Sequence, residues 1–208
     1  MRVLIADDHE VVRKGVKQIL ADGFGEIKFA DATNSTEMLD QAWRQKWDLV
    51  LLDISMPGRS GLEALVELKK QRPKLPVLVL SMFSEREYAV RALKAGASGY
   101  LTKQSLGKDL LDAVKKALAG GRYVTPALAE LLAADLEKTA EVPHEALSDR
   151  EYEVMKLIAA GRSVKEIAHG LHLGEKTVFT YRARLLEKLG LKSDVEIARY
   201  ALRHRLVE

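Results

Sequence analysis

The first 121 residues alternate between short apolar runs and longer segments with helical periodicity. The apolar runs are bounded by charged or turn-forming residues, which is typical of strands buried on both faces of a parallel sheet. Five strands alternating with five helices predict an α/β fold, a doubly wound parallel sheet with helices on both faces. The predicted strands are 3–6, 27–32, 49–52, 77–80 and 99–101, and the predicted helices are 10–20, 35–45, 61–71, 84–94 and 105–119.

The stretch DLVLLDISMPGRSG, residues 48–61, places a carboxylate at the end of the third strand. Its apolar run ends on Asp53, and the Met-Pro-Gly sequence that follows excludes a continued strand or helix. Ligands and chemistry gather at the carboxyl edge of open α/β sheets. Asp53 is therefore a candidate reactive group, and an ordinary turn-forming aspartate is the alternative at this point.

Polar side chains follow the other central strands as well. Asp7 and Asp8 come after the first strand, Ser81 after the fourth and Lys103 after the fifth. Three crowded carboxylates resist ionisation unless a cation compensates them, and an all-oxygen site open to water, without histidine or cysteine, suits Mg²⁺. Asp53 is then expected to be a nucleophile toward a phosphoryl group, whose oxygens Lys103 and Ser81 contact. Each of these residues by itself can be explained as a helix cap or as a solvated charge. Their joint occurrence at successive strand ends favours a functional site.

Composition limits the class of protein. The 208 residues are 47% hydrophobic and 30% charged, as in ordinary globular domains, and include no cysteine, which excludes disulfides and thiolate metal sites. No apolar run is long enough for a signal peptide or a membrane span. We therefore expect a cytoplasmic protein without membrane contact.

The remaining residues read as an acidic linker and a helical domain. Residues 122–146 contain one predicted helix, from Pro126 to about Lys138, and then the connector TAEVPHEA. Residues 147–208 are expected to form four helices. Three of these helices begin with the capping-box pattern, a serine followed three residues later by glutamate, at Ser148, Ser163 and Ser193.

A short helix, a turn containing glycine and a longer basic helix predict a helix-turn-helix in residues 164–190. Five basic residues against one acidic residue from Lys176 to Lys192 would neutralise DNA phosphates. A small helical bundle with a basic surface is the alternative from the pattern alone.

Residues 1 to about 121 resemble the receiver domain of two-component response regulators, which has a flavodoxin-like fold. The resemblance rests on DD after the first strand, D with MPG after the third, S after the fourth and GYLTK around the fifth. It implies phosphoryl transfer from a phosphohistidine of a sensor histidine kinase. The implied roles are phosphoacceptor for Asp53, Mg²⁺ ligands for Asp7, Asp8, Asp53 and the Ser55 backbone carbonyl, switch residues for Ser81 and Tyr100, and phosphate-binding lysine for Lys103.

A phosphatase of the haloacid dehalogenase type shares this nucleophile and is the rival enzyme class. It needs a second aspartate two residues after the first to act as general acid, and this chain has Ser55 there. We therefore expect a phosphoryl group on Asp53 to persist and to be lost only slowly, so that the protein is not a turnover enzyme.

Residues 147–208 resemble the LuxR-type DNA-binding domain. The motifs are LSDREYEVMKLIAAGRSVKEIA, EKTVFTYRARLLEKLG and LKSDVEIARYAL. The aromatic residues Phe179 and Tyr181 stand where the family usually has polar or basic residues and histidine, and they put the family's base preference in doubt. The resemblance implies a core of Val178, Leu185 and Leu189. The implied DNA-binding residues are Lys176, Thr177, Phe179, Thr180, Arg184 and Lys188.

Together the two resemblances imply a DNA-binding response regulator of the NarL/FixJ class. Phosphorylation of Asp53 is expected to unmask the helix-turn-helix or to promote a homodimer on two half-sites of double-stranded DNA. The alternative is a phosphorylation-independent transcriptional regulator that uses the receiver as a dimerisation surface.

Overall fold

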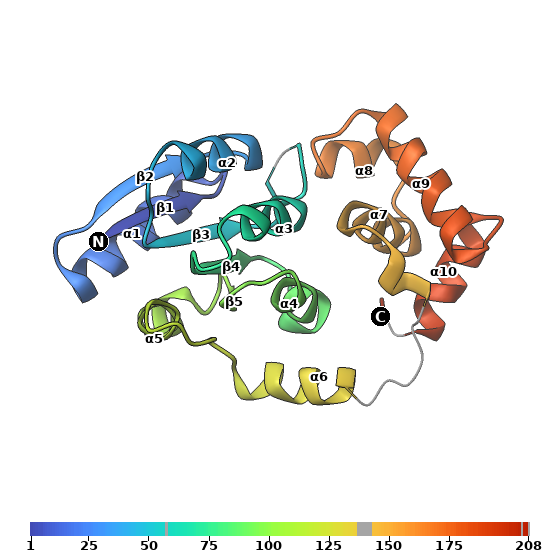
Figure 1. Ribbon diagram of the computed structural model, residues 1–208. Coiled ribbons are helices and arrows are strands. Elements are labelled where there is room, and N and C mark those ends of the chain that lie inside the picture. Colours follow the sequence, from blue (N-terminus) through green and yellow to red (C-terminus); the bar gives the residue numbers. More distant parts are fainter. Residues whose placement is uncertain (57, 137–142, 205, 208) are drawn as a thin grey trace. The chain divides into compact units, whose positions relative to one another are not determined.

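The computed structural model describes residues 1–56, 58–136, 143–204 and 206–207, and the chain forms two compact units. The first unit comprises Met1–Glu137 and the second comprises Lys138–Glu208. The first is a sheet flanked by helices, and the second is helical (Figure 1). The predicted fold class, a doubly wound parallel sheet followed by an all-α domain, is confirmed.

Five parallel strands form the sheet of the first unit: β1 (Arg2–Ala6), β2 (Lys28–Ala32), β3 (Leu49–Asp53), β4 (Val77–Ser81) and β5 (Gly99–Thr102). Their order is β2-β1-β3-β4-β5. Strand order therefore reverses between β1 and β3, which makes this the switch point where open α/β sheets bind ligands. β3 and β4 are buried along their whole length, which explains their continuous apolar runs, whereas the edge strand β2 is partly exposed and more polar.

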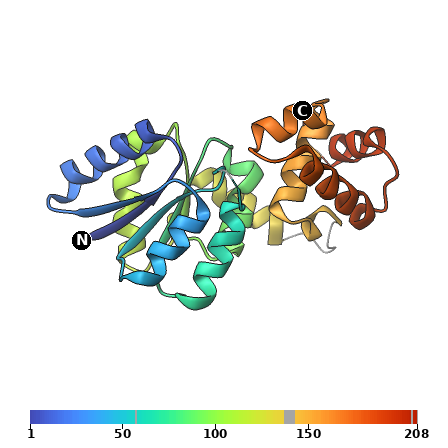
Figure 2. The same ribbon diagram turned by 90° about the horizontal axis from the view of Figure 1, so that it is seen from above.

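Five helices cover this sheet: α1 (Glu10–Phe24), α2 (Ser35–Arg44), α3 (Gly61–Gln71), α4 (Glu85–Lys94) and α5 (Leu106–Leu118). On one face α1 and α5 pack together over Ile5, Leu51 and Leu80 of the three central strands. Elsewhere α2 contacts α3, and α4 lies along β5 (Figure 2). The two apolar layers fix the positions of the central strand ends.

Helix α1 extends beyond its predicted end. The sequence predicted that Gly23 ends this helix, but the helix continues to Phe24. Gly25 follows it with a φ of 73°, in the left-handed region. Gly23 has a packing role instead, because a Cβ atom there would lie 2.4 Å from Leu111 Cδ2 on α5. The close approach of α1 and α5 thus requires a glycine inside the helix.

The helix predicted in the linker, α6 (Pro126–Leu136), docks on the first unit. It packs against α4, Leu128 is fully buried, and Lys94 Nζ lies 2.7 Å from Asp135 Oδ2. The predicted connector that follows, residues 139–146, is described only from Pro143 onward. There it forms a short 3-10 turn, η1 (Pro143–Ala146), instead of the irregular chain that was predicted.

The second unit contains four helices over its described residues: α7 (Asp149–Ala159), α8 (Val164–Gly170), α9 (Glu175–Leu189) and α10 (Asp194–Arg203). Val178 and Leu185 of α9 are fully buried, as predicted, whereas Leu189 is only half-buried because it lies at the end of the helix. α7 packs against both α9 and α10. Among the described residues, every helix is too short or too polar to span a bilayer.

Two of the three predicted capping boxes form in full. At Ser148 and at Ser163 the serine side chain accepts a backbone N–H while the glutamate three residues later accepts the serine N–H. The third is incomplete. Ser193 Oγ accepts the Glu196 N–H, but the Glu196 carboxylate accepts the N–H of Lys192 at 2.6 Å. The helix start is still capped, with its second bond one residue earlier than predicted.

Candidate functional site

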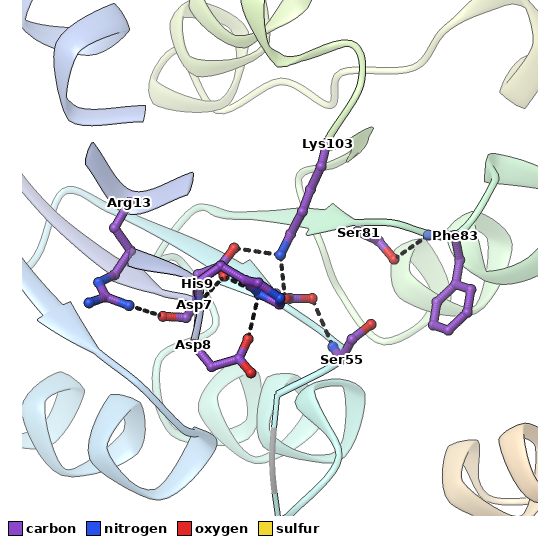
Figure 3. A network of polar contacts seen from close by, with 9 residues as sticks. Asp7, Asp8, His9, Arg13, Ser55, Ser81, Phe83 and Lys103 are labelled. Carbon is purple, nitrogen blue, oxygen red and sulfur yellow. Dashed lines mark hydrogen bonds and ion pairs between the residues drawn. The ribbon is translucent and has the colours of Figure 1, made fainter. Parts of the chain in front are cut away.

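The predicted polar residues at the ends of β1, β3 and β5 converge on one ammonium group. Lys103 Nζ lies 2.6 Å from Asp53 Oδ2 and 2.7 Å from Asp7 Oδ2. Figure 3 shows the Lys103 side chain pointing toward the Asp7 carboxylate. Both carboxylates are fully buried, and 5% of the Lys103 side chain is exposed. The expectation of a site open to water is therefore wrong for these two aspartates, because the flanking loops and helices enclose them.

Burial controls the electrostatics of this cluster. Burial raises the pKa of the Asp53 carboxyl above its ordinary value, although the nearby Lys103 ammonium lowers it. Burial also lowers the pKa of Lys103, but the Asp53 and Asp7 carboxylates outweigh that effect, so its pKa is raised overall. Lys103 thus stays charged, and burial makes the Asp53 carboxyl harder to ionise than a free aspartate.

The carboxylates form a group that suits a divalent cation. One ligand atom from each of Asp7, Asp8, His9 and Asp53 lies within 4.8 Å of the others. Three carboxylates and one lysine leave about two negative charges uncompensated, and carboxylate oxygens are the ligands that Mg²⁺ prefers. The residues present therefore fit a divalent metal ion.

The expectation of a site without histidine is wrong. His9 Nδ1 lies 3.2 Å from Asp7 Oδ1 and 2.8 Å from Asp8 Oδ1. The sequence prediction considered only residues that directly follow strands, and His9 stands one position later, at the start of α1. A histidine immediately after the Asp7-Asp8 pair was the available signal.

Backbone groups and one arginine hold the aspartates in place. The Ser55 N–H donates to Asp53 Oδ1 at 2.8 Å, and Arg13 Nη1 donates to the Asp7 carbonyl at 2.7 Å (Figure 3). Gly61 is needed where α3 begins, since a Cβ there would lie 2.5 Å from Ile54 Cα and 2.6 Å from the Asp53 carbonyl oxygen. This close packing of backbone fixes the loop that carries Ser55.

The two predicted switch residues both contact the backbone of Phe83. Ser81 Oγ accepts the Phe83 N–H at 3.1 Å, so its hydroxyl is directed toward Phe83 (Figure 3). Tyr100 is fully buried, and its hydroxyl donates to the Phe83 carbonyl at 2.9 Å. The segment between β4 and α4 is therefore tied to both side chains.

In the second unit, α8, a turn and α9 form the predicted helix-turn-helix. His172 in the turn has a φ of 53°, a left-handed conformation that is uncommon for a residue other than glycine. The Leu173 N–H donates to the Ala168 carbonyl at 2.8 Å and closes the turn. Gly174 then precedes the first residue of α9.

One side of α9 gathers most of the residues predicted to contact DNA. A shallow depression on this helix is lined by Lys176, Thr177, Thr180, Tyr181 and Arg184. Two cations and two hydroxyl-bearing threonines are thus exposed beside a half-buried aromatic ring, on the helix of the helix-turn-helix that enters the DNA groove in this motif.

The other two predicted DNA-binding residues lie outside this depression. The Phe179 side chain is 54% exposed. The Lys188 ammonium lies 2.6 Å from Glu151 Oε2 of α7 and 3.3 Å from the Ala146 carbonyl. A contact between Lys188 and DNA remains a prediction, and the ammonium already has a carboxylate partner within its own unit.

An aspartate cluster at the switch point of a receiver-like sheet and a separate helix-turn-helix define the class of the protein, a regulator with an input unit and a DNA-reading unit. Residues 3–115 match the response regulator receiver domain, and residues 145–201 match the bacterial regulatory proteins of the luxR family. The chain belongs to the response regulators of the NarL/FixJ class, in which a receiver is joined to a LuxR-type DNA-binding domain.

Full-length relatives show the same organisation. The chain is 38% identical over 210 residues to the response regulator GacA of Pseudomonas aeruginosa, covering 100% of this chain and 98% of the relative. It is 35% identical over 209 residues to the response regulator UvrY of Escherichia coli K12, covering 99% and 95%. The protein is therefore a DNA-binding two-component response regulator that regulates transcription, and its family is one of regulators rather than of enzymes.

Solved structures agree with this assignment. RcsB of Salmonella enterica serovar Typhimurium, bound to a promoter in the presence of the phosphomimetic BeF₃⁻, matches with a TM-score of 0.60 and 26% identity, covering 96% of this chain and 97% of RcsB. The response regulator ChrA of a heme-sensing two-component system matches with a TM-score of 0.51 and 32% identity, covering 99% and 98%.

Proposed function

We propose that phosphorylation of Asp53 by a sensor histidine kinase controls how this protein binds DNA. In this proposal residues 1–121 are the receiver, 122–146 the linker and 147–208 the DNA-binding domain. The observation that carries the proposal is the buried Asp53 carboxylate, whose Oδ2 lies 2.6 Å from Lys103 Nζ beside two further aspartates. A structural ion pair needs one carboxylate, whereas a cluster of three carboxylates with one lysine beside two of them creates a demand for additional positive charge.

The chemistry follows from which Asp53 oxygen is engaged. Oδ1 accepts the Ser55 N–H and Oδ2 accepts from Lys103 Nζ. When Oδ2 attacks phosphorus, the Lys103 ammonium is expected to shift from that oxygen to the phosphoryl oxygens and to offset their charge. The new O–P bond forms as the P–N bond of the kinase phosphohistidine breaks, and its electron pair returns to the imidazole. A Mg²⁺ ion held by Asp7, Asp8, Asp53 and the Ser55 carbonyl would supply further charge neutralisation.

Phe83 is the proposed route from Asp53 to the rest of the receiver. In this proposal the Ser81 hydroxyl shifts toward a phosphoryl oxygen on Asp53, and the shift alters the hydrogen bond that its oxygen accepts from the Phe83 N–H. Because Tyr100 binds the carbonyl of the same residue, the segment leading into α4 then changes its contacts. Because α6 packs against α4, a change in the contacts of α4 would reach the linker helix.

The output is binding of double-stranded DNA through α9, with Lys176 and Arg184 contacting phosphates and the threonines beside them nearer the bases. A homodimer on two half-sites is supported by the RcsB structure of two dimers bound to two parallel DNAs. Because its target is DNA, we place the protein in the cytoplasm.

A gel-shift comparison tests the proposal. Three proteins are compared: the wild type, Asp53→Asn and the control Asp40→Asn, which changes an exposed aspartate on α2. Each is titrated onto a DNA site obtained by selection for binding, with and without Mg²⁺ and beryllofluoride. We expect beryllofluoride to tighten binding about tenfold or more for wild type and control, a coupling within the usual 1–3 kcal/mol, and to leave Asp53→Asn unchanged.

Two results would favour other functions. Equal DNA affinity with and without beryllofluoride in the wild type would indicate a phosphorylation-independent regulator whose receiver only dimerises. Sustained phosphate release from a small phosphodonor would indicate a phosphatase. The lack of a carboxylate at Ser55 predicts a single turnover followed by slow hydrolysis instead.

A further inference from the structure

His9 faces the aspartate cluster although it occupies a helix-capping position. It is the N-cap residue of α1, with an extended backbone, yet its side chain makes no capping hydrogen bond among the described residues. Its own N–H donates to Asp7 Oδ1 at 2.8 Å, which brings the start of the helix up to the carboxylates. The imidazole Nδ1 then forms a hydrogen bond with Asp7 Oδ1 at 3.2 Å and lies 2.8 Å from Asp8 Oδ1 (Figure 3).

The spacing of these atoms matches neighbouring positions around one metal ion. Ligands bound at 2.0–2.1 Å in an octahedron lie about 3 Å apart when they are adjacent. His9 Nδ1 is 2.8 Å from Asp8 Oδ1 and 3.2 Å from Asp7 Oδ1, which brackets that separation. The Asp53 carboxylate belongs to the same group of atoms, all within 4.8 Å.

Hydrogen bonding does not account for the His9 contact with Asp8. Asp8 Oδ1 is buried and accepts no hydrogen bond from any described residue, although Nδ1 is 2.8 Å away. A buried carboxylate oxygen without a donor calls for a cation. That cation is either a metal ion shared by Nδ1 and the oxygens or a protonated imidazole itself.

We propose that His9 is a protein ligand of the divalent cation and that this site favours first-row transition ions such as Mn²⁺ over Mg²⁺. The inference rests on the proposed function, because it concerns the same metal site. Imidazole nitrogen suits transition metals, whereas Mg²⁺ takes oxygen ligands and keeps its waters. His9 adds nitrogen to a ligand set that would otherwise contain oxygen alone.

Metal binding to the full-length chain tests this inference. Mn²⁺ and Mg²⁺ are titrated separately by calorimetry into wild type, His9→Asn and the control His169→Asn, at pH 8, where histidine is ordinarily neutral. Asparagine is a good N-cap, so α1 keeps a favourable start. We expect His9→Asn to weaken Mn²⁺ about tenfold and Mg²⁺ by less than about twofold, with no change in the control.

Pulsed electron paramagnetic resonance of bound Mn²⁺ gives a direct readout. Imidazole nitrogen coupling is expected in the wild type and in His169→Asn and is expected to disappear in His9→Asn. If Mn²⁺ binds without that coupling, or if His9→Asn leaves the affinity for Mn²⁺ unchanged or tightens it, the inference is overturned while the proposed function stands. If neither ion binds any of the three proteins, the proposed metal-assisted function fails as well.

Discussion

At the scale of single residues, charge balance explains why so many polar groups share one buried place. Asp53 and Asp7 are fully buried, and a lone buried carboxylate is costly. Lys103 compensates one charge, and its contacts with both aspartates hold it between β1 and β3. In the proposed function, the remaining negative charge is what attracts a metal ion to the site before a phosphoryl group.

The two basic residues Arg184 and Lys188 are predicted to differ in their effect on DNA binding. Arg184 lines the depression on α9, whereas the Lys188 ammonium lies 2.6 Å from Glu151. We expect Arg184→Ala to lower the slope of log affinity against log salt by about 1 and Lys188→Ala to lower it by less than about half as much. Equal reductions, measured by fluorescence anisotropy from 50 to 200 mM salt, would show that both contact phosphates.

Glu151 gives the second unit a predictable pH dependence. Burial raises its pKa, but hydrogen bonds from Lys188 and from the Ser148 N–H outweigh burial, so its pKa lies below the ordinary value. A lowered folded-state pKa stabilises the protein above the unfolded-state pKa, and the stabilisation is lost as the pH falls through the folded value.

We therefore expect Lys188→Met to lower the free energy of unfolding by about 1 kcal/mol at pH 7, with the loss shrinking below about pH 4.5 as Glu151 is protonated. Urea unfolding followed by circular dichroism measures this difference. Lys192→Met, a change at another exposed lysine just after α9, is the control. A deficit that stays constant down to pH 3 would contradict the assigned ion pair.

Spacing in the sequence located the candidate site but not the direction of its side chains. Asp7, Asp53 and Lys103 were predictable because parallel strands end at the same edge of a sheet. His9 was missed, and so was the pairing of Lys188 with Glu151, because both depend on rotamers and on contacts between distant elements. No local pattern encodes those.

At the scale of elements, buried strands and capped helices were predicted well and helix ends less well. The continuous apolar runs of β3 and β4 and the serine caps of α7 and α8 are local signals. Gly23 and Gly25 are both plausible helix terminators, and only the packing of Leu111 against Gly23 shows that Gly25 is the one used. Docking of α6 likewise depends on a surface of α4 that its own sequence does not reveal.

The left-handed backbone at His172, in the turn of the helix-turn-helix, is predicted to decide which residues can replace it. A φ of 53° costs a β-branched residue about 1–2 kcal/mol. We expect His172→Val to lower the free energy of unfolding by that amount, and His172→Gly to leave it unchanged or slightly higher.

The matched control for that turn is His169→Val on α8, where helical backbone keeps the cost to about 0.5 kcal/mol. Thermal or urea unfolding of the full chain measures all three variants. Equal losses for His169→Val and His172→Val would show that side-chain contacts, rather than the left-handed backbone, decide stability in this turn.

At the scale of the whole molecule, the chain joins a receiver, whose charge would change on the proposed phosphorylation, to a DNA-binding domain. A regulator of this kind often acts as a dimer. α10 carries two exposed apolar side chains seven residues apart, Val195 and Leu202, with 68% and 56% of their surface exposed. Residues with that spacing lie on the same side of a helix. Exposed apolar side chains on one side of a helix suit a contact with another protein surface, so we predict that these two form the contact between two copies.

We expect Val195→Lys to weaken binding to DNA with two half-sites by about tenfold, because a lysine placed in a symmetric contact faces its own copy and repels it. Binding to a single half-site should change by less than about twofold, since the residues that line the depression on α9 all belong to α9 itself. Val66→Lys, the same change at an exposed valine on α3, is the control. Gel shifts on DNA with one and with two half-sites, together with sedimentation of the free protein, distinguish pairing of two copies from contact with DNA. Equal losses of affinity on both DNAs would assign Val195 to the DNA interface. No loss on either DNA would place the pairing surface elsewhere.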